Sequence, residues 1–172
     1  MIELAKSLEY ITILPDQLDK DPWKLNVQNG AIDLKTGKIG IHQRDNLITK
    51  ILPVEYNPRA TCPTWLSFLD RIMDGNSDLI RFLQKGVGYS LTGSTSEQCL
   101  LILHGHGANG KSVFLSTIAS VLGAYSDQTP VSTLMIKRGE SVPNDIARLK
   151  GTRFVVAVEV EAGQRLAESL VK

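Results

Sequence analysis

The residues with the clearest capacity for chemistry form a glycine-rich turn in the second half of the chain. The segment Gly105-x-x-x-x-Gly110-Lys111-Ser112 has the spacing of the phosphate-binding P-loop. Its glycines allow backbone N–H groups to converge on a polyphosphate, and a helix behind the turn would add the positive end of its dipole. We expect Lys111 to reach the β- and γ-phosphates of a nucleotide and Ser112 to hold Mg²⁺. The residues expected to bind the nucleotide are Gly105, His106, Gly107, Ala108, Asn109, Gly110, Lys111, Ser112 and Val113.

The segments on either side of this turn favour a nucleotide site over a chance match. Residues 100–103 form an uninterrupted apolar run, which predicts a strand buried on both faces. The turn is followed by apolar residues at helical spacing, namely Val113, Phe114, Ile118, Val121 and Leu122. A P-loop pattern is informative when it joins a strand to a helix, as it is expected to do here.

Two glutamates provide a second set of candidate residues. The apolar run 154–158 predicts another buried strand, and Glu159 and Glu161 stand at its end, about 50 residues after the P-loop. Because side chains alternate along a strand, both carboxylates would point the same way, one toward the Mg²⁺ shell and the other toward an attacking water. The alternative is that both are solvated residues at a strand exit. We expect Glu161, Glu159 and Lys111 to be catalytic, and Ser112 and Glu159 to be metal ligands.

Other candidate chemistry is sparse. The three histidines, His42, His104 and His106, lack the Cys/His spacing of a zinc site, and we interpret His106 as a variable position of the loop. A locally basic stretch could contact phosphate backbones, although a solvated surface is the usual role of such residues. Its members are Lys137, Arg138, Arg148, Lys150 and Arg153.

Composition indicates an ordinary globular chain of 172 residues. It has 19 Lys plus Arg against 18 Asp plus Glu, so net charge gives no argument for nucleic acid or an acidic membrane. Cys62 and Cys99 are interpreted as free thiols in a reducing compartment. Because no signal peptide or long apolar span is apparent, we expect a soluble intracellular protein with no membrane partner.

The N-terminal part predicts a helix, a connector and a small sheet. Apolar residues recur at helical spacing in 1–10, whereas prolines and aspartates in 11–22 indicate a connector. Asn29-Gly30 favours a type I′ hairpin turn, and Thr36-Gly37 a second turn, which together predict a three-stranded meander packed on the next helical block. A ligand-binding loop over 35–38 is the functional alternative. The expected cross-strand pairs are Val27 with Ile32, Leu25 with Leu34, Leu34 with Ile39 and Ile32 with Ile41.

From Cys62 the apolar period becomes helical. One helix is expected to begin at Pro63 and stop at Gly75, and a second, capped by Ser77, to end before Gly88. Their apolar stripes are interpreted as core rather than as a base-stacking platform. The first stripe is Trp65, Phe68, Leu69, Ile72 and Met73, and the second is Leu79, Phe82, Leu83 and Val87. Residues 126–143 are expected to be irregular apart from the apolar run 131–136, and 144–150 to form a brief helix.

These elements predict an α/β fold with three parts. Residues 1–60 would hold the N-terminal helix, connector and meander, 61–93 the helical pair, and 94–172 a P-loop ATPase-like core with a parallel sheet.

With these motifs assembled, the sequence resembles the helicase part of phage and plasmid replicative primase-helicases, superfamily 3 helicases related to the poxvirus primase-helicase. The resemblance covers most of the chain from Asp21, and the Gly-x-Asn-Gly-Lys-Ser form of residues 107–112 is its most specific element. The segments that carry it are DPWKLNVQNGAIDLKTGKI, ITKILPVEYNPRATCPTWLSFL, LQKGVGYSLTGSTSEQCLLILHGHGANGKSVFL and DIARLKGTRFVVAVEVEAGQRLAESLVK.

The resemblance implies a ring-forming, usually hexameric, ATP-driven translocase on single-stranded DNA, with ATP and Mg²⁺ as cofactors. It also implies a phage- or plasmid-encoded protein in the cytoplasm of a bacterial host. The glutamate-rich motif that follows a strand in the family matches Glu159 and Glu161.

The sequence departs from the family at both ends. Family members continue beyond the position of Lys172 into a DNA-contacting segment, a polar sensor residue and an arginine finger, and a primase half precedes them. We therefore expect a fragment or a truncated product. Two functions stay open, an ATPase motor and a non-catalytic nucleotide-binding or assembly module, and a P-loop small-molecule kinase is a weaker third.

Overall fold

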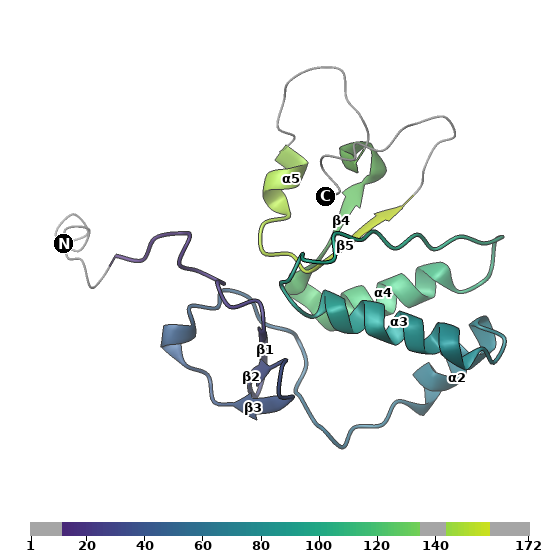
Figure 1. Cartoon of the computed structure of the whole chain (residues 1–172), viewed down its shortest axis with the longest axis horizontal. Coiled ribbons are helices and arrows are strands. Elements are labelled where there is room, and N and C mark those ends of the chain that lie inside the picture. The colour runs from purple at the N-terminus through teal and green to yellow at the C-terminus, as the bar shows by residue number, and fades with distance from the viewer. Residues whose placement is uncertain (1–11, 135–143, 159–172) are drawn as a thin grey trace.

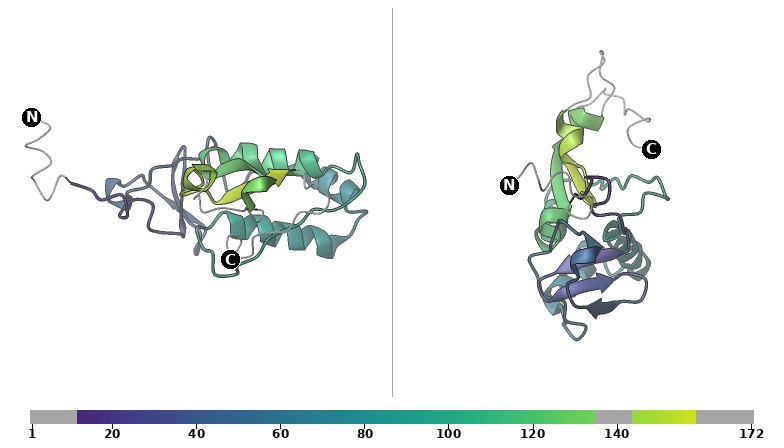
Figure 2. Two further views of the ribbon diagram at one scale, coloured as in Figure 1. Left: turned by 90° about the horizontal axis from the view of Figure 1, so that it is seen from above. Right: turned by 90° about the vertical axis from the view of Figure 1, so that its left-hand side faces the viewer.

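The computed structural model describes residues 12–134 and 144–158. It is a mixed α/β structure with a three-stranded antiparallel sheet, β1-β2-β3, and a two-stranded parallel sheet, β4-β5. In the view of Figure 1, helices α2, α3 and α4 lie below β4 and β5, and the antiparallel sheet lies beyond the left-hand end of α3 and α4. Figure 2 shows the same arrangement from above and from the side. The predicted α/β class is confirmed, and the predicted helix over 1–10 lies outside the described residues.

The antiparallel sheet is the predicted meander, with a different register. Strands β1 (Lys24–Val27), β2 (Gly30–Asp33) and β3 (Lys38–Gly40) pair in sequence, and residues 12–22 before them contain no helix or strand. The expected pairings are wrong by two residues at both turns, because Leu25 pairs with Ile32, Val27 with Gly30, and Ile32 with Ile39. A shift by two preserves the face of every side chain, so Leu25, Val27 and Ile32 are buried together as expected.

Side-chain hydrogen bonds explain the shift. The Asn29 side chain donates to the carbonyl of Tyr56 at 3.0 Å and accepts the N–H of Tyr56 at 2.9 Å. These two bonds hold Asn29 in the turn while Gly30 joins the strand. Gly30 has φ +153° and no room for a side chain, because a Cβ would stand 2.2 Å from the carbonyl oxygen of Gly40. At the second turn the Asp33 carboxylate accepts the N–H groups of Lys35 and Thr36, so the turn begins at Asp33.

The meander packs on the far end of the helix that follows the predicted P-loop, rather than on the helical pair. Helix α4 (Lys111–Leu122) leads through the 3₁₀ turn η2 (Gly123–Tyr125) into the core. That core comprises Leu25, Val27, Ile32, Leu52, Leu122 and Tyr125. The expectation that the helical pair covers the meander is therefore wrong, since the apolar partners come from the C-terminal end of α4 and from Leu52, in the segment 41–62 that follows the meander. The short 3₁₀ helix η1 (Arg44–Asn46) lies in the same segment.

The helical pair is confirmed in outline. Helix α2 (Pro63–Ile72) has Pro63 in its first turn, and the chain reverses at Gly75, which has φ +68°. Helix α3 (Ser77–Ser90) is capped by Asn76, one residue before the expected cap, because the Asn76 side chain accepts the N–H of Leu79 at 3.0 Å. Contrary to expectation, α3 continues through Gly88.

The predicted burial of the α3 stripe is wrong. No residue of α3 is fully buried, and Leu79 and Phe82 are 42% and 55% exposed. Apolar spacing on a helix establishes that one face is apolar, but burial requires a partner element. The described part of the chain puts no element over these two side chains.

The strand predicted for residues 100–103 is also wrong. This segment contains no helix or strand and pairs with no strand of the described chain, and Ile102 is 77% exposed. Leu101 lies against α3, where a Cβ on Gly86 would come within 2.9 Å of its Cδ1. An apolar run becomes a strand only when a neighbour takes its backbone hydrogen bonds, and here β5 is paired with β4 instead.

The parallel pair contains one predicted strand and one unexpected one. Strand β5 (Phe154–Val158) has the predicted bounds, but Val155 is 41% exposed rather than buried. Strand β4 (Ser126–Pro130) lies in a stretch expected to be irregular, and the predicted apolar run continues from it as the 3₁₀ turn η3 (Val131–Leu134). Helix α5 (Asn144–Arg148) confirms the brief helix. Helix α4 packs against both strands.

The side chain of Arg153 joins the three parts of the described structure. Its guanidinium donates to the carbonyl of Lys24 in β1 at 2.7 Å and to the carbonyl of Leu91 after α3 at 2.6 Å. It also lies over the ring of Tyr125, 4.8 Å from the centroid, and the Tyr125 hydroxyl donates to the carbonyl of Lys50 at 3.0 Å. Burial lowers the pKa of Arg153 and raises the pKa of Tyr125 from their ordinary values.

We expect Arg153→Met to lower the free energy of unfolding by about 2–4 kcal/mol, because two carbonyls lose a charged donor in a partly buried place. The matched control is Arg148→Met, since Arg148 is 53% exposed and pairs with Asp127 at 3.2 Å, for which a loss of about 0–1 kcal/mol is expected. Urea denaturation of both variants measures the difference. Equal losses would show that Arg153 does not join the parts as described.

Tyr125 gives a pH prediction. Burial raises its pKa, so the folded state disfavours the phenolate, and this contribution to stability is present below the ordinary pKa of about 10 and lost as pH rises through the folded value. Tyr125→Phe should make the melting temperature fall less steeply as the pH rises from about 9 to about 11, because phenylalanine has no hydroxyl to ionise. Tyr56→Phe is the control. A parent and a Tyr125→Phe variant with parallel pH curves would contradict the prediction.

Candidate nucleotide-binding site

The predicted P-loop residues form an exposed turn that leads directly into α4. Gly105 and Gly110 have φ +156° and +84°, and Ala108 has φ +58°, so three of the six positions from 105 to 110 adopt backbone angles that L side chains rarely take. The first helical hydrogen bond runs from the N–H of Phe114 to the carbonyl of Gly110 at 2.9 Å. The N–H groups of Lys111, Ser112 and Val113 precede that bond and have no acceptor within the helix. The turn therefore has the backbone form that can receive an anion.

Lys111 is folded back into this turn. Its Nζ donates to the carbonyl oxygens of Gly105 and His106 at 2.8 and 3.3 Å, and to Oδ1 of Asn109 at 2.7 Å. The Asn109 side chain covers Gly105 so closely that a Cβ there would meet its Nδ2 at 2.2 Å. The ammonium thus has three oxygen acceptors supplied by the turn, and this is the kind of surrounding that phosphate oxygens would also provide.

The remaining loop residues fit the same ligand. Ser112 is exposed in the first turn of α4, one residue after Lys111, where its hydroxyl is available to a metal ion. His106 and Gly107 are also exposed. Hard oxygen donors and free N–H groups suit a magnesium-bound polyphosphate, and the composition of the turn is therefore consistent with ATP and Mg²⁺.

The structure does not test the two glutamates. Strand β5 ends at Val158, and Glu159 and Glu161 lie outside the described residues. In the described ranges, no group of three or more His, Cys, Asp or Glu side chains could hold a metal ion. Cys62 and Cys99 are free, as predicted, and both are exposed.

The predicted basic stretch is largely engaged elsewhere. Arg153 is half-buried and donates to two backbone carbonyls, so neither a phosphate contact nor a solvated surface, the two roles considered for the stretch, describes this residue. Arg148 donates to the carbonyl of Gln128 at 2.7 Å and pairs with Asp127. Lys150 is exposed, and Lys137 and Arg138 lie outside the described residues.

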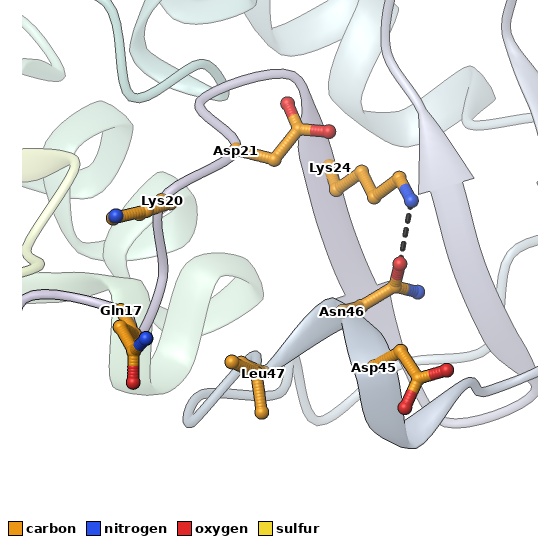
Figure 3. Close-up of a pocket in the computed structure, with 7 residues that line it drawn as sticks. All are labelled: Gln17, Lys20, Asp21, Lys24, Asp45, Asn46 and Leu47. Atoms are coloured by element: carbon orange, nitrogen blue, oxygen red, sulfur yellow. Dashed lines mark hydrogen bonds between the residues drawn. The ribbon is translucent and has the colours of Figure 1, made fainter. Parts of the chain in front are cut away.

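A polar pocket lies beside the meander, away from the phosphate loop. Figure 3 shows its lining, in which Lys24 Nζ donates to Oδ1 of Asn46 at 2.5 Å. It encloses about 380 Å³ and carries both signs of charge. None of its residues belongs to the predicted nucleotide site. The lining residues are Gln17, Lys20, Asp21, Lys24, Asp45, Asn46 and Leu47.

Sequence reasoning missed two features of the loop. One is the bond between Asn109 and Lys111, for which the two-residue spacing gave no specific signal. The other is the contact of α2 with the loop, because Phe68 and Ile72 stand behind Gly110. The apolar spacing of α2 did mark both side chains, but it identified them only as core.

Comparisons with known proteins agree with the family suggested by the motifs. The family model described as "D5 N terminal like" matches residues 1–74, which contain the meander and α2 but not the phosphate loop. A curated protein of Acanthamoeba polyphaga mimivirus, named "Putative helicase L207/L206", is 25% identical over 161 residues.

That match covers 90% of this chain, a share that necessarily includes the loop, and 17% of the viral protein. The chain therefore spans about a sixth of the length of the curated relative. No helix in the described residues is long and apolar enough to cross a membrane. The family-model match and the viral relative together support the relationship of this chain to the phage and viral primase-helicases.

Proposed function

We propose that this chain binds Mg·ATP at the loop Gly105–Ser112 and supplies the ATPase portion of a superfamily 3 DNA helicase. The observation that carries the proposal is the position of the Lys111 ammonium, 2.7–3.3 Å from three oxygens at the start of α4. Binding a triphosphate there exchanges these oxygens for those of the β- and γ-phosphates. The exposed N–H groups of the first turn complete an anion site, and Ser112 provides a ligand for Mg²⁺.

The chemistry assigned to the site is hydrolysis of the γ-phosphate. Lys111 neutralises charge on the phosphates, and Mg²⁺, when bound, orients them and stabilises developing charge. Glu159 and Glu161 directly follow β5, and we assign them to the metal shell and to the attacking water. The partners that accompany this proposal are single-stranded DNA and further copies of the chain in a ring, because the viral relative is named a helicase.

A nucleotide-binding or assembly module without turnover is the second candidate. One observation favours it, namely that residues 100–103 before the loop form no strand in the described structure. A loop whose leading segment is unpaired can bind phosphates, but it is held less firmly than hydrolysis requires. The two candidates differ in turnover and agree on binding.

We expect Lys111→Ala to abolish measurable Mg·ATP binding while the melting temperature changes little, because Lys111 is only half-buried and its side chain bonds within its own turn. The control is Lys38→Ala, an exposed lysine of β3 at the other end of the molecule. Calorimetric titration with Mg·ATP, paired with thermal melts, measures both. Parental affinity in Lys111→Ala would end the claim that the loop binds nucleotide.

Two substitutions distinguish the roles proposed for Glu159 and Glu161. Glu161→Gln should retain ATP binding and lower hydrolysis by about 10²–10⁴-fold, because an amide cannot accept the proton of the attacking water. Glu159→Ala should weaken only the metal-dependent part of binding. Glu97→Gln, at an exposed site before the loop, is the control. Intact turnover in both variants would show that neither residue belongs to the site.

A further inference from the structure

Three side chains of α2 and α4 form a small aromatic cluster behind the phosphate loop. The ring of Trp65 stacks on Phe68 of the same helix, with centroids 5.3 Å apart, and on Phe114 of α4, with centroids 5.6 Å apart. Phe114 is 5% exposed and donates the first hydrogen bond of α4 to the carbonyl of Gly110. Trp65 therefore contacts Phe114, and Phe114 is hydrogen-bonded to Gly110, where the helix begins.

The same face of α2 contacts the loop at Gly110. A Cβ built on Gly110 would stand 2.8 Å from Cγ2 of Ile72 and 3.2 Å from Cε2 and Cζ of Phe68. No side chain fits in this space, so the backbone of Gly110 rests directly against Phe68 and Ile72. Gly110 has φ +84°, and the contact holds this conformation at the last position before Lys111.

These contacts are separate from the main core. The core cluster lies at the opposite end of α4, around Leu122 and Tyr125, and it includes no residue of α2. Trp65, Phe68 and Ile72 are only half-buried. Their packing therefore bears on the loop end of α4 more than on the burial of the main core.

We propose that Phe68 and Ile72 are positioning residues of the nucleotide site and that Trp65 senses its occupancy. The inference rests on the proposed function. By fixing Gly110, the two side chains set the direction of the N–H groups of Lys111 and Ser112 toward the phosphates. A ligand that pulls on these groups shifts Gly110 and Phe114, and the shift reaches the Trp65 ring through the stacking contact with Phe114.

The test uses Trp65 as the sole tryptophan. The chain has two tryptophans, and Trp23 is in the meander, where Lys35 lies 5.1 Å from its ring centroid, so Trp23→Phe removes its emission and keeps an aromatic ring. In this background, saturation with Mg·ATP should change the emission of Trp65. Calorimetry on the same sample reports binding independently of the fluorescence.

Substitution of Phe68 supplies the second readout. Phe68→Ala should weaken Mg·ATP affinity by about tenfold, because the N–H groups lose their fixed direction, and Phe68→Leu should restore most of it by refilling the contact. Phe82→Ala is the matched control, since Phe82 is 55% exposed on α3. If Phe68→Ala does not fold, Ile72→Ala replaces it, with Ile72→Val as its conservative partner.

The outcomes separate the inference from the proposed function. A parent protein with no calorimetric binding overturns the nucleotide site itself, and the inference with it. A parent that binds Mg·ATP while Trp65 emission stays constant, or a folded Phe68→Ala variant with parental affinity, overturns the inference alone. Loss of affinity in Phe82→Ala equal to that in Phe68→Ala also overturns it, because the effect would then be general.

Discussion

The guanidinium of Arg153 is the interaction on which the arrangement of the described parts depends. It stands at the start of β5 and donates to carbonyls of β1 and of the segment after α3, while the ring of Tyr125 lies beneath it. A lysine could not replace it, because a single ammonium on a flexible side chain does not hold two donors in fixed directions toward two different segments. The meander, the helical pair and the parallel strands each contribute only short elements, so their mutual orientation rests on such bonds more than on a large shared core.

Helix α4 connects the core to the candidate site. Its C-terminal end is fixed in the core by Leu122 and, one turn later, by Tyr125, and its N-terminal end begins at Gly110. A helix of 12 residues is a stiff rod about 18 Å long, so the position of the loop is determined partly at the end remote from it. The matched family model covers the meander and α2, the two parts that contact the ends of α4.

Local signals in the sequence predicted where helices and turns begin and end better than they predicted which elements pair or pack together. Pro63, Gly75 and the glycine turn before Lys111 marked helix ends correctly, because caps and turns depend on neighbouring residues. The register of the meander differed by two residues, since Asn29 is bonded to Tyr56, which is 27 positions away. The run 100–103 was apolar enough for a strand but has no paired neighbour in the described chain, and β4 was missed because its buried Thr129 is satisfied by the hydroxyl of Thr133. The loop was found from spacing alone, whereas its support by α2 depends on tertiary contact.

The hydrogen bonds of Lys111 within its own turn reduce the net free energy that an anion could gain by binding to this lysine. Because the ammonium already has three oxygen acceptors, an incoming anion gains only the difference between its own oxygens and those of Gly105, His106 and Asn109. A single phosphate offers few oxygens and leaves the exchange close to balance, whereas a polyphosphate can replace all three acceptors and occupy the N–H groups of α4 as well. For the ligand proposed at this site, the turn would therefore favour a long phosphate chain over a single phosphate.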